Sequence, residues 1–157
     1  MIYVFDTSAF VSLFGNFYPK RFPSLWDLFD KMVDEERIVS TREVRREIAD
    51  QDDSLKAWTR SHSAVFATPT RDEALFVSDI YQVPHFQANI EQKKLLKGGK
   101  NADPFVVAKC SVLGDDASVV TLERHKRNAA KVPNICEHFG IASMDLEQFM
   151  EAEEWTF

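Results

Sequence analysis

Four acidic residues lie at points in the chain from which their carboxylates could meet around a cation: Asp6, Glu47, Asp103 and Glu123. Carboxylates gathered in one cleft repel one another, so such a cluster is unfavourable unless a cation neutralises it. Oxygen ligands suit hard ions such as Mg²⁺ or Mn²⁺. Because these ions activate water and stabilise charge on a phosphate, the pattern indicates metal-dependent hydrolysis of phosphodiesters.

Asp6 is the most informative of the four acids. The chain begins Met-Ile-Tyr-Val-Phe-Asp-Thr-Ser, an apolar run of β-favouring residues that ends in a carboxylate. Ligands of open parallel sheets collect at the carboxyl ends of the strands. An acid at the tip of a buried first strand, followed by the hydroxyls of Thr7 and Ser8, is therefore well placed to build a cation site.

The other three acids depend on the elements that must position them. Strand signals alternate with helix signals, which indicates an α/β fold with a parallel sheet covered by helices. Glu47 lies in a helix that a capping box of Ser40 and Glu43 begins. Asp103, which a proline follows, has the pattern of a helix start, and Glu123 comes just after a strand. Each position can face the same edge of the sheet.

The expected elements extend along the whole chain. Strands are predicted at residues 1–5, 37–39, 117–122 and 141–144. Helices are predicted at residues 24–36, 40–50, 55–62, 84–96 and 103–114, and from about residues 70, 134 and 145, with cap pairs Ser24/Asp27, Thr70/Glu73 and Asn134/Glu137. The aromatic residues 14–22 are predicted to form a loop that packs on the core, an exposed part of which could bind a partner.

Each acid also has a structural interpretation. Asp103 could serve only as a helix N-cap. Glu47 could be a solvated helix residue paired with a neighbouring arginine. Glu123, followed by Arg124, could be surface charge. Asp6 is the hardest to explain in this way, because a polar residue that ends a buried strand needs a reason.

Composition limits the class of protein. The 157 residues favour a single domain, residues 1–157, and 45% apolar and 28% charged residues are ordinary for a globular protein. No apolar run approaches a membrane span, and no basic leader precedes the first strand. Cys110 and Cys136 are expected to be reduced core thiols, which favours a cytoplasmic location. The net charge of −6 argues against a generally basic nucleic-acid binder, although not against a nuclease whose acids hold metal.

Taken together, four segments resemble the PIN-domain ribonucleases, and more narrowly the VapC-like toxins of bacterial toxin–antitoxin pairs. The ordered matches are Val-Phe-Asp-Thr-Ser at 4–8, Val-Arg-Arg-Glu-Ile at 44–48, Ala-Asp-Pro-Phe-Val-Val-Ala at 102–108 and Val-Val-Thr-Leu-Glu at 119–123. The ending, Val-Pro-Asn-Ile-Cys at 132–136 followed by Gly-Ile at 140–141, is similar to a subgroup of uncharacterised toxin-like PIN proteins.

The resemblance implies a three-layer α/β/α sandwich and a ribonuclease that uses Mg²⁺ or Mn²⁺. It assigns the four acids to metal binding and catalysis, and Thr7, Ser8 and Thr121 to supporting hydroxyls. It further implies the toxin of a type II toxin–antitoxin system, with an RNA substrate, a cognate antitoxin and a homodimer. The chain departs from the commonest pattern at Glu123, where many relatives carry aspartate.

Basic residues flank the acids on both sides. Lys93, Lys94, Lys97 and Lys100 lead into Asp103, and Arg124 begins a second basic run after Glu123. Lys94, Lys97, Lys100 and Arg124 are therefore candidates to bind RNA phosphates. The alternative is a solvated helix face on an acidic protein.

Two other functions fit parts of the pattern. A haloacid dehalogenase-type phosphatase also starts with an apolar strand ending in aspartate, but it needs a second aspartate where this chain has Ser8. A non-catalytic PIN-like module that binds nucleic acid or protein would usually lack one or more of the acids, and this chain keeps four candidates.

Overall fold

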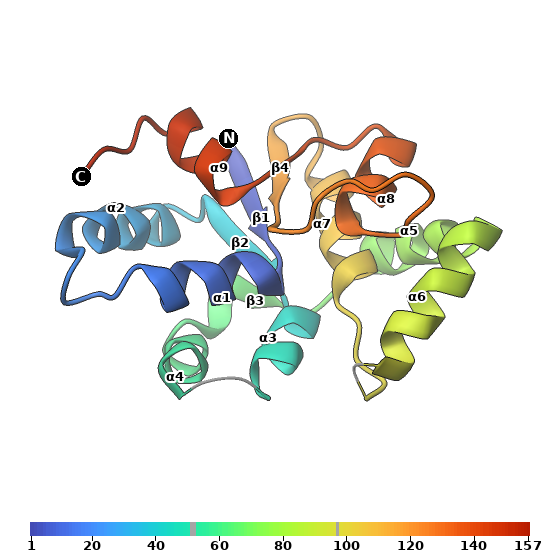
Figure 1. The fold of residues 1–157 in the computed structure, drawn as a ribbon, viewed down its shortest axis with the longest axis horizontal. Helices are drawn as coiled ribbons and strands as arrows, with labels where there is room; N and C mark the ends of the chain where they lie inside the picture. Colours follow the sequence, from blue (N-terminus) through green and yellow to red (C-terminus); the bar gives the residue numbers. More distant parts are fainter. Residues whose placement is uncertain (51–52, 97) are drawn as a thin grey trace.

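A computed structural model of the chain describes residues 1–50, 53–96 and 98–157. Its centre is one sheet of five parallel strands in the order β3-β2-β1-β4-β5 (Figure 1). The strands are β1 (Ile2–Phe5), β2 (Ile38–Thr41), β3 (Phe66–Ala67), β4 (Ala117–Val120) and β5 (Ser143–Met144). The prediction of an α/β fold with a central parallel sheet is confirmed.

Helices cover both faces of this sheet, which makes the fold a three-layer α/β/α sandwich (Figure 1). The described helices are α1 (Thr7–Asn16), α2 (Pro23–Asp34), α3 (Arg42–Ile48), α4 (Asp53–Ser61), α5 (Arg71–Tyr81), α6 (Pro84–Leu96), α7 (Asp103–Leu113), α8 (Val132–Phe139) and α9 (Leu146–Ala152), with a 3-10 turn η1 (Ser63–Val65). Helix α7 contacts β1, β2 and β4 and packs against α5 and α8, while α6 lies against α5.

The opposite face is covered by an aromatic layer. The ring of Phe5 contacts Phe10 of α1, Phe29 of α2 and Phe149 of α9, with ring centroids 5.2–6.2 Å apart. Tyr3, Val4 and Phe5 are all buried, because a parallel strand with helices on both faces has no solvent side. The continuous apolar run at the start of the chain is thus the central strand of the sheet.

The prediction of a loop at residues 14–22 is wrong for its first part, because helix α1 extends from Thr7 to Asn16. Asp6 caps this helix, since its Oδ1 accepts a hydrogen bond of 2.8 Å from the Ala9 N–H. Phe10 is buried and Phe14 packs on the core, so the two aromatic residues, four positions apart, form the inner side of a helix.

Several predicted element boundaries need correction. Helix α2 begins at Pro23 without a side-chain cap from Ser24, and Thr41 rather than Ser40 caps α3. The Ser40 hydroxyl instead donates to the Phe5 carbonyl across the sheet at 2.7 Å. Asn134 lies inside α8, where it hydrogen-bonds to the Lys126 backbone.

Other local predictions are confirmed. Thr70 and Glu73 form the capping box of α5, and Asp145 caps α9. Cys110 and Cys136 are both buried free thiols. Within residues 1–50, 53–96 and 98–157, no helix is both long enough and apolar enough to cross a membrane.

Candidate functional site

The carboxyl ends of β1 and β4 lie side by side at the centre of the sheet. The two strands pair in parallel with Phe5 opposite Val120, so Asp6 and Thr121 leave the sheet at the same edge. Asp6 is 3% exposed and Thr121 is 2% exposed. A carboxylate and a hydroxyl are thus buried together where the two central strands end.

Asp6 is held by its own chain segment. Its Oδ1 accepts hydrogen bonds from the Ser8 hydroxyl at 2.7 Å and from the Ala9 N–H at 2.8 Å. Ser8 in turn accepts from the Leu122 N–H at 2.9 Å and lies 3.5 Å from the Thr121 hydroxyl. Ser8 therefore connects the segment after β1 to the segment after β4.

Burial raises the pKa of Asp6 to about 7. Hydrogen bonds from Thr121, Ser8 and the Ala9 backbone oppose this shift, and the negative charge of Asp103 adds to it. The Asp6 carboxyl is thus a group that a nearby cation would help to ionise.

Glu47 is buried on α3, with 8% of its surface exposed. Its Oε1 accepts a hydrogen bond of 3.0 Å from the Thr7 hydroxyl and one of 3.3 Å from the Ala102 N–H. The interpretation of Glu47 as a solvated helix residue is therefore wrong. Its contacts connect α3 to the residues that follow Asp6 and precede Asp103.

Asp103 is the first residue of α7, and its side chain does not cap the helix. The N-cap position belongs to Ala102, and the Asp103 N–H is instead bound by the Asn101 side-chain oxygen at 3.2 Å. The Asp103 carboxylate contacts the Lys93 ammonium, with 2.6 Å between Oδ2 and Nζ. The interpretation of Asp103 as only an N-cap is therefore wrong.

Glu123 is held at three points. Its N–H donates to the Thr121 hydroxyl at 3.1 Å, and its Oε2 accepts from the Val132 N–H at 2.8 Å. Its Oε1 lies 3.0 Å from Lys93 Nζ, and 23% of its side chain is exposed. Glu123 is thus a positioned, partly buried carboxylate rather than free surface charge.

Two residues of this network are not distinguished by the sequence. Burial lowers the pKa of Lys93, whereas the carboxylates of Asp103 and Glu123 raise it. Their combined effect is larger than that of burial, so the net shift of the pKa is upward and the amine is charged. The Asn101 side-chain nitrogen is buried without a hydrogen-bond partner in the described structure. Lys93 is one of several lysines in its run, and nothing in the sequence marks it as the one that faces the acids.

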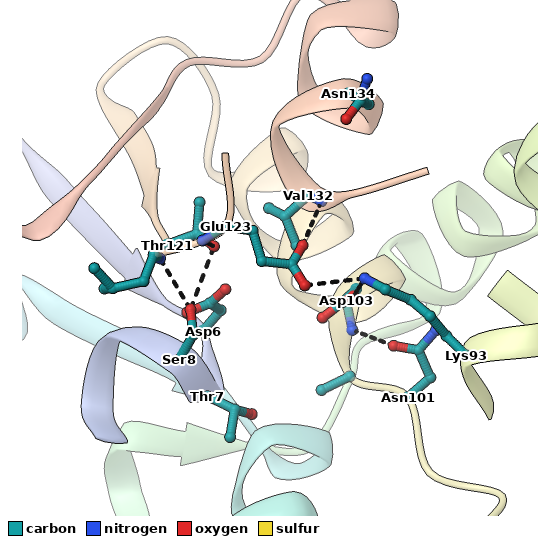
Figure 2. A network of polar contacts seen from close by, with 12 residues as sticks. Asp6, Thr7, Ser8, Lys93, Asn101, Asp103, Thr121, Glu123, Val132 and Asn134 are labelled. Atoms are coloured by element: carbon teal, nitrogen blue, oxygen red, sulfur yellow. Dashed lines mark hydrogen bonds and ion pairs between the residues drawn. The ribbon is translucent and has the colours of Figure 1, made fainter. Parts of the chain in front are cut away.

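Figure 2 shows the side chains of Asp6, Asp103 and Glu123 directed toward a common space, with Lys93 reaching in from α6. In the ranges that the structure describes, no three His, Cys, Asp or Glu side chains are arranged to hold a metal ion as they stand. The donor set nevertheless fits a hard cation, because it consists of carboxylate oxygens and one pair already binds a shared positive charge. Asp6, Asp103 and Glu123, with Glu47 beside them, are the residues that could hold it.

The predicted basic residues differ in their surroundings. Lys94 and Arg124 are exposed, whereas Lys100 Nζ lies 2.6 Å from the Asp50 carboxylate. Lys97 falls outside the described residues. Arg124 borders a hollow of about 420 Å³ that Glu123 and Thr121 also line.

A second cavity lies at the other end of the sheet. It has a volume of about 580 Å³ and is lined by Ile2, Ile38 and Leu113, among others, near the amino ends of β1 and β2. Asp116 is at this end as well, where its carbonyl accepts from the Ile2 N–H at 2.8 Å. None of the four candidate acids lines this cavity, so it is separate from the candidate site at the carboxyl edge.

Comparison with known proteins assigns the chain to a family. We found no match among curated proteins. Residues 3–157, nearly the whole chain, match the family described as a domain of unknown function, DUF4411. The protein with these acids at the carboxyl edge of its sheet therefore belongs to the DUF4411 family.

Proposed function

We propose that this protein is a divalent-metal-dependent endoribonuclease whose active site contains Asp6, Glu47, Asp103 and Glu123. The observation that supports the proposal most strongly is that two of the four acids share one ammonium group and the other two are buried beside the same chain segments. Glu123 and Asp103 contact the same ammonium group, and Ser8 connects Asp6 to the segment that carries Glu123. Carboxylates in such proximity favour a bound cation.

The residues have different parts in this proposal. Asp6, Asp103 and Glu123 would hold Mg²⁺ or Mn²⁺, and such an ion supplies an activated water and stabilises charge on the phosphate. Glu47 would complete the site from α3, oriented by the Thr7 hydroxyl. Ser8 and Thr121 would keep Asp6 in position.

The resemblance to PIN-domain proteins extends the proposal to the biological role of the protein and to its partners. By that resemblance the protein is the VapC-like toxin of a type II toxin–antitoxin system, acts on RNA in the cytoplasm, forms a homodimer and is held inactive by an antitoxin. The three-layer parallel fold is compatible with this proposal. The phosphatase alternative is not supported, since Ser8 stands where a second aspartate would be needed and donates to Asp6.

The direct test is RNA cleavage by the purified chain. We expect a mixed RNA substrate to be cut internally with Mn²⁺ or Mg²⁺ and to remain intact with excess EDTA, because the carboxylates alone do not activate water. Gel electrophoresis of end-labelled RNA measures the cleavage. Intact RNA with either metal would contradict the proposal.

A second candidate is a non-catalytic PIN-like binding module. The observation that favours it is the neutralisation of Asp103 and Glu123 by Lys93, which gives both carboxylates a partner without metal. Calorimetric titration with Mn²⁺ separates the candidates. A nuclease site should show saturable binding, and a module without a metal site should show no heat beyond dilution.

RNA binding is expected to depend on Lys94 and Arg124, the members of the predicted set that are exposed in the described part of the chain. The double charge reversal Lys94→Glu/Arg124→Glu should weaken binding and reduce the slope of log K against log salt by roughly 1.4, because each phosphate neutralised on a single strand contributes about 0.7. Fluorescence anisotropy in EDTA measures this while the RNA stays intact.

A single-site control is Lys31→Glu on α2, where 71% of the lysine side chain is exposed, and it changes the net charge by half as much as the double variant. It lies on another part of the molecule and should leave the salt slope unchanged. An unchanged slope in the double variant as well would mean that Lys94 and Arg124 belong to a solvated surface.

A further inference from the structure

Lys93 makes a partly buried ion pair with two carboxylates at once. Its Nζ lies 2.6 Å from Asp103 Oδ2 and 3.0 Å from Glu123 Oε1, and 24% of its side chain is exposed. The three residues come from α6, from the start of α7 and from the segment after β4. One ammonium therefore bridges two of the candidate metal ligands (Figure 2).

The bridge is held on both carboxylate sides. The second oxygen of Glu123 accepts from the Val132 N–H, and the backbone of Asp103 is fixed by Asn101. The Glu123 carboxylate is consequently oriented by the surrounding structure, and the backbone that carries the Asp103 carboxylate is fixed in place. By contrast Lys94, the next residue, is exposed to solvent.

A divalent cation and this ammonium would compete for the same oxygens. Two positive charges a few ångströms apart inside a partly buried site repel strongly, because the effective dielectric constant is lower there than in water. A metal ion that takes the Asp103 and Glu123 oxygens must first break both contacts of Lys93. Its affinity is therefore reduced by the free energy of those contacts.

We propose that Lys93 is an internal counter-ion that occupies the Asp103–Glu123 pair and must be displaced before a divalent cation binds there. This inference rests on the proposed function, because it assumes that the pair belongs to a metal site. In this role Lys93 binds carboxylates of the protein itself, whereas an RNA-binding lysine would contact phosphates of the substrate. The residue keeps the two acids neutralised while metal is scarce and sets the metal concentration at which the site fills.

The test is calorimetric titration of the whole chain with Mn²⁺ alone. Lys93→Met should bind Mn²⁺ at least about 10-fold more tightly than the wild type, since a hydrogen bond to a charged group typically contributes about 10-fold to 150-fold to an equilibrium constant. Lys93→Arg keeps a cation at this place and should remain within about 2-fold of the wild type. Lys31→Met, which removes one positive charge from α2, should not change the affinity.

Unchanged or weaker Mn²⁺ affinity in Lys93→Met, with wild-type binding and RNA cleavage intact, would overturn the inference and leave the proposed function standing. Tighter binding in Lys93→Met, with no RNA cleavage by the wild type, would support the inference and contradict the nuclease. No Mn²⁺ binding by either protein would overturn both. Circular dichroism of each variant shows whether it is folded, and Lys93→Gln replaces Lys93→Met if the latter is not.

Discussion

Asp103→Asn is expected to lower Mn²⁺-dependent RNA cleavage by at least about 100-fold. Removal of a residue that only supports a metal ligand typically lowers affinity or activity about 10-fold to 100-fold, and removal of a ligand itself should exceed that. Asparagine has nearly the same shape but no negative charge. Because Asp103 does not cap α7, the substitution should leave the helix start intact. Initial rates on end-labelled RNA measure the effect.

The control for this experiment is Asp115→Asn. Asp115 is exposed between α7 and β4, at the end of the sheet away from the four acids. The Asp115→Asn substitution removes one negative charge, as Asp103→Asn does, so general electrostatic effects on RNA binding are the same in both variants. Cleavage by Asp103→Asn at the wild-type rate would show that this carboxylate takes no part in the reaction.

Asp6→Asn is expected to stabilise the metal-free protein at pH 8 and to have little effect near pH 4. The buried carboxyl has a pKa of about 7 in the folded chain against 3.8 for the group's ordinary value. Asparagine can still accept the hydrogen bonds from Ser8 and Ala9 through its side-chain oxygen. The substitution therefore removes an unfavourable buried charge while keeping the helix cap.

The sign follows from proton linkage. A carboxyl whose pKa is raised by folding binds its proton more tightly in the folded state, so its contribution to stability is full below pH 3.8 and falls as pH rises from 3.8 through 7. A shift of this size corresponds to at most about 4 kcal/mol, at about 1.36 kcal/mol for each pKa unit. Urea denaturation in EDTA at pH 4 and pH 8 measures the free energy of unfolding.

Mn²⁺ should reverse the order of stability at pH 8. The wild type should gain stability with added Mn²⁺, because binding to the folded state alone stabilises it, and Asp6→Asn should gain less. Asp145→Asn is the matched control, since Asp145 also caps a helix and asparagine caps about as well. Equal stability of wild type and Asp6→Asn at pH 8 in EDTA would contradict this prediction. It would mean that hydrogen bonds to the Asp6 carboxylate fully offset the unfavourable free energy of burying its charge.

Predictions that depend on local sequence are the most accurate ones. The central strand β1 is predictable because a strand covered on both faces must be apolar throughout. The caps Thr70 with Glu73 and Asp145 with Gln148 are predictable because their hydrogen bonds involve residues three apart. The two-residue strand β3 has no sequence signal of its own, since it is defined only by pairing with β2.

Errors arise where a local pattern competes with a distant contact. Ser40 resembles a helix cap, but the parallel sheet places its hydroxyl beside the Phe5 carbonyl. Helix α1 is a different case, because Phe10, Leu13 and Phe14 already recur at helical spacing and the prediction of a loop overlooked this local pattern. Asn134 binds a loop rather than a helix end.

By itself the sequence determined the parallel α/β architecture and the acids that deserve a functional hypothesis, because strand tips and helix starts are local features. Only the tertiary structure decided which charges meet. Lys93 and Glu123 are 30 positions apart in the chain, yet their charged atoms are 3.0 Å apart. Nothing in the sequence from Lys93 to Asp103 indicates that the side chains of Lys93 and Asp103 are in contact either. Side-chain partners depend on how α6, α7 and the sheet pack together, and that packing is a property of the whole core rather than of any segment.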